Sequence, residues 1–134
     1  MKKFVCAMFS IIFMLLFCGC DSRNTVSSEF GQEVTIAKLP SPPKCKTTDS
    51  VSVANEIIDV LAQIEKKPLD SEKINGGWQF MIKLKIDGQS FNYTIGNIFT
   101  DSDKKQYIVE NCNEITEKIT KIYDKIDAPE VDYP

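Results

Sequence analysis

The chain has 134 residues, a formal net charge of −3 and no histidine. The lack of histidine excludes Ser–His and Cys–His nucleophile pairs and histidine-based zinc sites. Because the charge balance is acidic and no basic cluster occurs, we expect no nucleic acid partner.

The N-terminal residues 1–19 have the organisation of a signal peptide. Lys2 and Lys3 give a positive start, and residues 4–17 are almost wholly apolar. A membrane span needs about 20 apolar residues, so this run fits the apolar region of a signal peptide better. We therefore expect export, which removes both lysines and leaves 115 residues with a formal charge of −5, the size of one domain.

The apolar run closes with Phe-Cys-Gly-Cys at residues 17–20, with the small Gly19 directly before the last cysteine. This segment resembles the lipobox of bacterial lipoproteins. The resemblance implies that Cys20 carries diacylglycerol as the new N-terminus and anchors the chain outside the cytoplasmic membrane, on the periplasmic side if the host has two membranes. In such a host, Asp21 resembles the signal for retention on the inner membrane. The alternative is an ordinary signal peptide cleaved after Gly19.

Two of the five cysteines, Cys45 and Cys112, remain once the signal peptide is removed and Cys20 is lipidated. An even pair in an exported, oxidising setting is a candidate disulfide. It would join the loop before the first helix to the start of the last helix. The alternative is two free cysteines, with Cys112 packed as a small apolar residue at the head of its helix.

The N-terminal part of the mature chain contains little regular pattern. Residues 20–31 are polar and predict a flexible tether. Residues 32–39 alternate loosely and predict a weak first strand. Pro40, Pro42 and Pro43 then favour an extended connector, because proline fits neither a helix interior nor a central strand.

Helical spacing follows from Thr48–Ser50, which offers the N-cap, to about Lys66, and Pro68 ends the segment. The apolar side of this helix comprises Val53, Ala54, Ile57, Ile58, Leu61 and Ile64.

Alternation in residues 78–86 predicts a strand with one buried and one wet face. Its apolar positions are Trp78, Phe80, Ile82, Leu84 and Ile86. Asp87-Gly88 is a hairpin turn dipeptide, and the return strand runs towards Gly96. After a second turn at residues 100–105, residues 106–110 predict a third strand.

The last helix begins at Asn111, a candidate N-cap with Glu114 three residues later. Its inward stripe comprises Cys112, Ile115, Ile119, Ile122 and Ile126. The acidic, proline-broken residues 127–134 predict a disordered tail.

These elements predict a single α+β domain at residues 32–126: an antiparallel β-meander of three to four strands with two amphipathic helices packed on one face. By pattern, residues 49–125 are similar to small α+β domains of uncharacterised bacterial lipoproteins, which implies the same fold.

No catalytic motif, metal site or cofactor site is indicated, and we expect no enzyme. There is no Cys-x-x-Cys pair and no phosphate-binding loop. Asp101-Ser102-Asp103 resembles the start of a calcium loop, but Gln106 replaces the required glycine and Cys112 the required glutamate.

The wet face of the hairpin is the most suggestive surface, although a solvated sheet also shows such residues. It comprises Met81, Lys83, Lys85, Asn92 and Thr94. Exposed sheet faces and edges dock partner chains. We therefore expect a lipid-anchored, non-catalytic module that binds a protein partner in the envelope.

The alternative function is a small-ligand receptor with Trp78, Tyr93 and Tyr107 around an aromatic cleft. A third candidate is a hydrolase, which would need paired carboxylates across a cleft. Its candidate residues are Asp101, Asp103 and Glu110.

Overall fold

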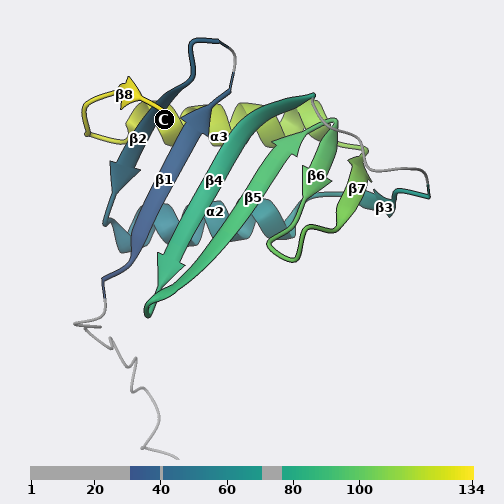
Figure 1. Ribbon diagram of the computed structural model, residues 1–134, viewed down its shortest axis with the longest axis horizontal. Coiled ribbons are helices and arrows are strands. Elements are labelled where there is room, and N and C mark those ends of the chain that lie inside the picture. The colour runs from purple at the N-terminus through teal and green to yellow at the C-terminus, as the bar shows by residue number, and fades with distance from the viewer. Residues whose placement is uncertain (1–30, 40, 71–76) are drawn as a thin grey trace, which may run out of the picture.

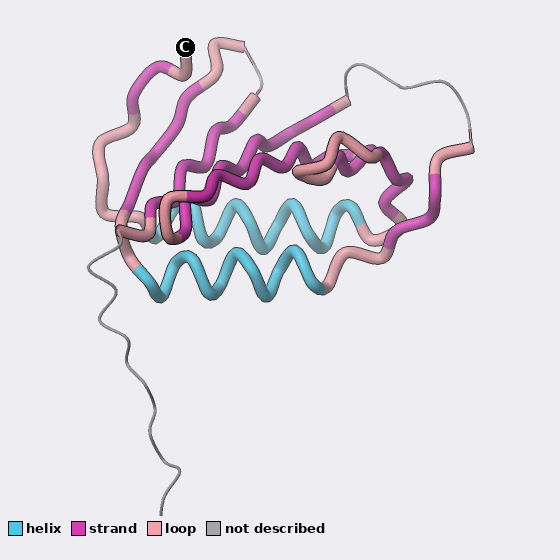
Figure 2. Tube along the Cα trace, turned by 60° about the horizontal axis from the view of Figure 1, so that its bottom comes forward, coloured by secondary structure: helices cyan, strands magenta, loops and turns pink. Residues whose placement is uncertain are grey.

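The computed structural model describes residues 31–39, 41–70 and 77–134. These residues form one antiparallel sheet of eight strands in the order β3-β7-β6-β5-β4-β1-β2-β8. The two helices of the described residues lie together on one face of the sheet (Figures 1 and 2). We call this the helix face and the opposite one the outer face.

The predicted meander of three to four strands is wrong, because the sheet has eight strands, whereas the broader α+β class fits. Four short strands account for most of the difference: β2 (Lys44–Thr48), β3 (Lys66–Pro68), β6 (Ile98–Thr100) and β8 (Val131–Asp132). Each is too short or too polar to show an apolar alternation of its own. They are strands because neighbouring strands pair with them.

The centre of the sheet follows the predicted pattern. The strand β4 (Trp78–Ile86) pairs with β5 (Gln89–Gly96) through the Asp87-Gly88 turn, in which both residues have positive φ, 49° and 79°. The weakly predicted first strand, β1 (Glu33–Lys38), is an internal strand, because β4 flanks it on one side and β2 on the other. The third predicted strand, β7 (Gln106–Val109), pairs with β6 and β3.

Both predicted helices are present. In α2 (Val51–Ala62), the Ser50 hydroxyl accepts the N–H of Val53 at 3.4 Å. The helix ends before the predicted Lys66. The amide of Asn111 bridges the loop after it, donating to the carbonyl of Gln63 and accepting the N–H of Glu65, both at 2.9 Å.

The second helix, α3 (Cys112–Lys125), therefore receives no side-chain cap from Asn111, contrary to the expected capping box.

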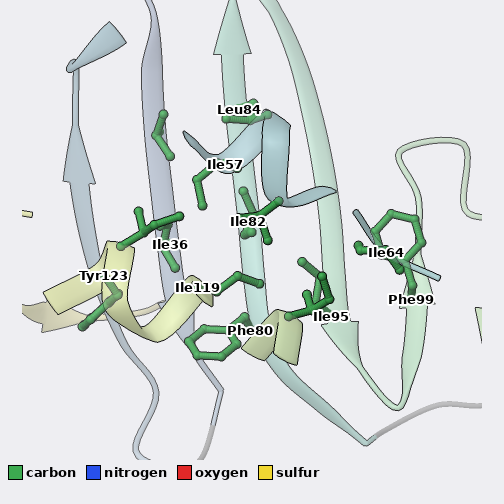
Figure 3. Close-up of a cluster of buried hydrophobic side chains, with 14 of the residues drawn as sticks. Ile36, Ile57, Ile64, Phe80, Ile82, Leu84, Ile95, Phe99, Ile119 and Tyr123 are labelled. Carbon is green, nitrogen blue, oxygen red and sulfur yellow. The ribbon is translucent and has the colours of Figure 1, made fainter. Parts of the chain in front are cut away.

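The core lies between the helix face and the two helices (Figure 3). Ile36, Ile82 and Ile95 from the sheet meet Ile57 of α2 and Ile119 of α3, and all five are fully buried. Burial of each such side chain contributes about 1.5–3 kcal/mol relative to exposure.

Residues 127–134, expected to be disordered, fold back along the sheet edge. Val131 pairs with Cys45 and Asp132 with Lys44. The N–H of Tyr133 donates to the carbonyl of Pro43 at 3.0 Å, and its hydroxyl lies 2.7 Å from the sulfur of Met81.

The predicted signal peptide, Cys20 and residues 20–30 of the predicted tether lie outside the described residues. Within the described ranges, no helix is long and apolar enough to cross a membrane.

We expect Gly96→Ala to lower the free energy of unfolding by about 3 kcal/mol. A Cβ at Gly96 would lie 2.0 Å from the carbonyl oxygen of Gly77 and 2.9 Å from the Cα of Trp78, and both are backbone atoms. Urea unfolding measures the loss. The control is Gly88→Ala, which meets no atom within 4 Å and adds only the strain of its φ of +79°, about 1 kcal/mol. Equal losses in the two variants would contradict the steric explanation.

Candidate functional site

The five residues of the predicted interaction surface share the outer face. The register pairs Met81 with Thr94 and Lys83 with Asn92, and Lys85 lies two positions further along β4. The alternating residues Phe80, Ile82 and Leu84 are in the core on the helix face, as the period of two requires.

These residues differ in access to solvent. Lys83, Lys85 and Asn92 are exposed, whereas Met81 and Thr94 are half-buried. The sulfur of Met81 accepts a hydrogen bond from the hydroxyl of Tyr133, so the C-terminal segment covers one end of the predicted surface. The exposed part is therefore a narrow patch of two lysines and one asparagine, which we call the lysine patch.

Neither Lys83 nor Lys85 has an ion-pair partner among the described residues, although Glu33 lies opposite Lys85 in the register. Six other lysines of these residues form ion pairs, namely Lys38, Lys44, Lys67, Lys118, Lys121 and Lys125. The lysine patch therefore presents two unpaired positive charges on an acidic chain.

Cys45 and Cys112 are both free and buried, and they lie on opposite sides of the sheet. Cys45 pairs with Ala37, which pairs with Met81, and this places its thiol on the outer face. Cys112 belongs to the core on the helix face. The sheet separates the two sulfur atoms, and Cys112 packs as a small apolar residue at the head of α3.

A cluster that the sequence analysis missed surrounds the C-terminal end of α3. The ammonium of Lys46 donates to the carbonyls of Tyr123 and Ile126, at 3.3 and 3.1 Å. This contact satisfies helix-end carbonyls and places a cation at the negative end of the helix dipole. The pKa of Tyr123 is raised, mainly by burial and secondly by the hydrogen bond that its hydroxyl donates to Glu130, so the hydroxyl stays protonated. The cluster stabilises the helix end and provides no base.

The aromatic trio of the alternative function is divided between the two faces. Tyr93 is on the helix face and stacks on Phe99, with ring centroids 6.0 Å apart, and Tyr107 lies next to Phe99 at 6.2 Å. Trp78 does not join them, because a bulge between Trp78 and Phe80 sets it opposite Gly96, in the row of Thr94. The expected inward position of Trp78 is therefore wrong.

Tyr93 lines a cleft of about 360 Å³ between α2 and the helix face of β4, β5 and β6, which we call the aromatic cleft. Its walls are Ile58, Leu61, Lys66, Leu84, Ile86, Phe91, Tyr93, Phe99 and Asp101. The lining residues are mostly apolar and come from segments that are distant in the sequence, so the sequence analysis did not predict this set of residues.

Two of the three carboxylates of the hydrolase hypothesis, those of Asp101 and Glu110, make structural contacts. Asp101 accepts the N–H groups of Asp103 and Lys105 at 3.0 and 2.9 Å, which closes the turn between β6 and β7. Glu110 pairs with Lys67. Among the described residues, no group of three or more Cys, Asp or Glu side chains is arranged to hold a metal ion.

We expect Cys45 and Cys112 to resist iodoacetamide in the native chain and to be alkylated fully in urea without reductant. The thiolate is the reactive form, and burial raises the pKa of both thiols above the ordinary 9.0, so little thiolate exists at pH 8. Mass spectrometry of the two cysteine-containing peptides measures the labelling. A disulfide would leave both peptides unlabelled until reductant is added.

Comparison of the chain with protein-family models, with curated proteins and with solved structures finds no match. What the protein does must therefore be inferred from its own residues.

Proposed function

We propose that the protein is a lipid-anchored module of the cell envelope that binds a protein partner through the outer face of its sheet. The lipobox resemblance at Cys20 supports the anchor, and the predicted tether at residues 20–31 would join the anchor to the folded domain. A fully extended segment of this length reaches at most about 40 Å. The partner is then a protein at or near the membrane surface.

The single observation that supports the binding role most directly is the lysine patch. Both helices of the described residues pack on the helix face (Figure 2), and Lys83, Lys85 and Asn92 on the outer face are exposed. There Lys83 and Lys85 have no ion-pair partner among the described residues. An exposed patch with unpaired cations complements an acidic surface, because complementary charge steers association and selects the partner.

The non-catalytic character of the proposal rests on the chemistry of the described side chains. Of the three carboxylates considered for hydrolysis, that of Asp101 holds a turn and that of Glu110 an ion pair. The two thiols are buried with raised pKa values, which is the opposite of an activated nucleophile. A second function, binding of a small ligand, is favoured by the aromatic cleft.

The anchor and the binding face are tested together in a bacterial host. We expect wild-type protein to carry a lipid mass increment and to enter the detergent phase, and Cys20→Ala to lose both. A photocrosslinking residue at Asn92 should give a discrete crosslinked species at the membrane. The same residue at Asn113, which is exposed on α3, should not.

Charge reversal by Lys83→Glu with Lys85→Glu should abolish the crosslink from Asn92. The control is Lys118→Glu with Lys121→Glu, which changes the charge equally on α3. An unmodified, soluble wild type would overturn the anchor. Equal crosslinking from Asn92 and Asn113, or no effect of charge reversal, would overturn the binding face.

A further inference from the structure

The aromatic cleft has opposed apolar walls that the fold leaves partly open. On α2, Ile58 is 42% exposed and Leu61 is half-buried. Across the cleft, Ile86 and Phe91 at the hairpin end of β4 and β5 are also half-buried. These side chains line a hollow of about 360 Å³ between α2 and this end of the hairpin. That volume lies within the range of about 300–1,000 Å³ typical of small-molecule sites.

The side of the cleft formed by β5 and β6 is aromatic. The rings of Tyr93 and Phe99 lie 10° from parallel, with centroids 6.0 Å apart. Tyr107 continues the row beyond Phe99 at 6.2 Å. A planar apolar group fits such a surface, since aromatic rings stack in offset or edge-to-face arrangements at these separations.

One end of the cleft carries unpaired positive charge. The ammonium of Lys66 lines the cleft and lies 5.4 Å from the ring centroid of Phe99 and 4.6 Å from that of Tyr107. Lys105 lies 5.4 Å from the same Tyr107 ring. Neither lysine has an ion-pair partner among the described residues.

Asp101 also lines the cleft, but its carboxylate accepts two backbone N–H groups of its own turn. Asp101 keeps its negative charge, and Lys66 is the one cationic residue of the cleft lining, so an acid group would pair with Lys66.

We infer that the aromatic cleft binds a small monoanion with a flat apolar body, whose acid group pairs with Lys66 and whose body lies between Ile58 and the Tyr93–Phe99 pair. The apolar walls and the unpaired ammonium are complementary to the two parts of such a ligand. This site is on the opposite side of the sheet from the lysine patch and does not depend on the proposed protein partner.

The probe is 2-naphthoate, which combines a fused ring with one carboxylate. Equilibrium dialysis against the full chain in lipid nanodiscs, with empty nanodiscs subtracted, should show saturable binding at one site per chain. We expect Lys66→Gln to weaken binding about tenfold, the loss of one charge-assisted contact. The matched control is Lys67→Gln: Lys67 is the next residue and pairs with Glu110, and its variant should bind as the wild type does.

A second pair of variants tests the apolar wall. Ile58→Ser should weaken binding several-fold, whereas Val51→Ser should not, because Val51 is 54% exposed on the same helix and does not line the cleft. Circular dichroism checks that all four variants fold. The neutral analogue 2-naphthamide should bind the wild type about as weakly as 2-naphthoate binds Lys66→Gln.

Three results would overturn the inference. The first is the absence of saturable 2-naphthoate binding, and the second is an equal loss with Lys66→Gln and Lys67→Gln. The third is equal affinity for naphthoate and naphthamide, which would mean that no charge contact exists.

Discussion

The nine residues of β4 pair with β1 on one side and with β5 on the other, so this strand holds the centre of the sheet. Its alternation sends Phe80, Ile82 and Leu84 to the helix face and Lys83 and Lys85 to the outer face. An apolar sheet face is stable only when another layer covers it. The helices α2 and α3 do so, and on the outer face β4 and β5 expose Lys83, Lys85 and Asn92. Every surface considered for function follows from this division.

The two edges of the sheet are protected in different ways. The edge strand β3 is three residues long and has the sequence Lys-Lys-Pro. Its charge and the missing N–H of its proline make it a poor template for another strand. At the other edge, β8 covers only Lys44 and Cys45 of β2. The C-terminal segment thus acts as a short strap, and Tyr133 extends it over Met81 on the outer face. Short edges of this kind limit pairing between molecules.

Unpaired lysines mark both candidate surfaces, although the surfaces differ in their surroundings. On the outer face, Lys83 and Lys85 stand among polar side chains on an open sheet, where their charge is screened by salt and suits recognition of an extended acidic surface. On the helix face, Lys66 lies against aromatic rings beside an apolar hollow. Lys66 is itself exposed, so a ligand there would combine a charge contact with Lys66 and burial of its apolar part in the hollow.

The sequence by itself determined the elements whose pattern is local. The spacing of apolar residues predicted both helices and β4, the Asp87-Gly88 pair predicted the hairpin, and the period of two placed Lys83, Lys85 and Asn92 on one face. Only the tertiary structure decided the short strands β2, β3, β6 and β8, because their stability comes from neighbours distant in sequence.

Tertiary structure also decided individual side chains whose surroundings come from distant segments. A bulge places Trp78 away from the core, and the sheet separates Cys45 from Cys112. The side-chain amide of Asn111 bonds to the loop after α2 and does not cap its own helix. The aromatic cleft joins α2 to β5 and β6, and no local pattern encodes that contact. Periodicity reports which face of an element is apolar, whereas packing of the whole chain decides which apolar faces meet and where a gap remains between them.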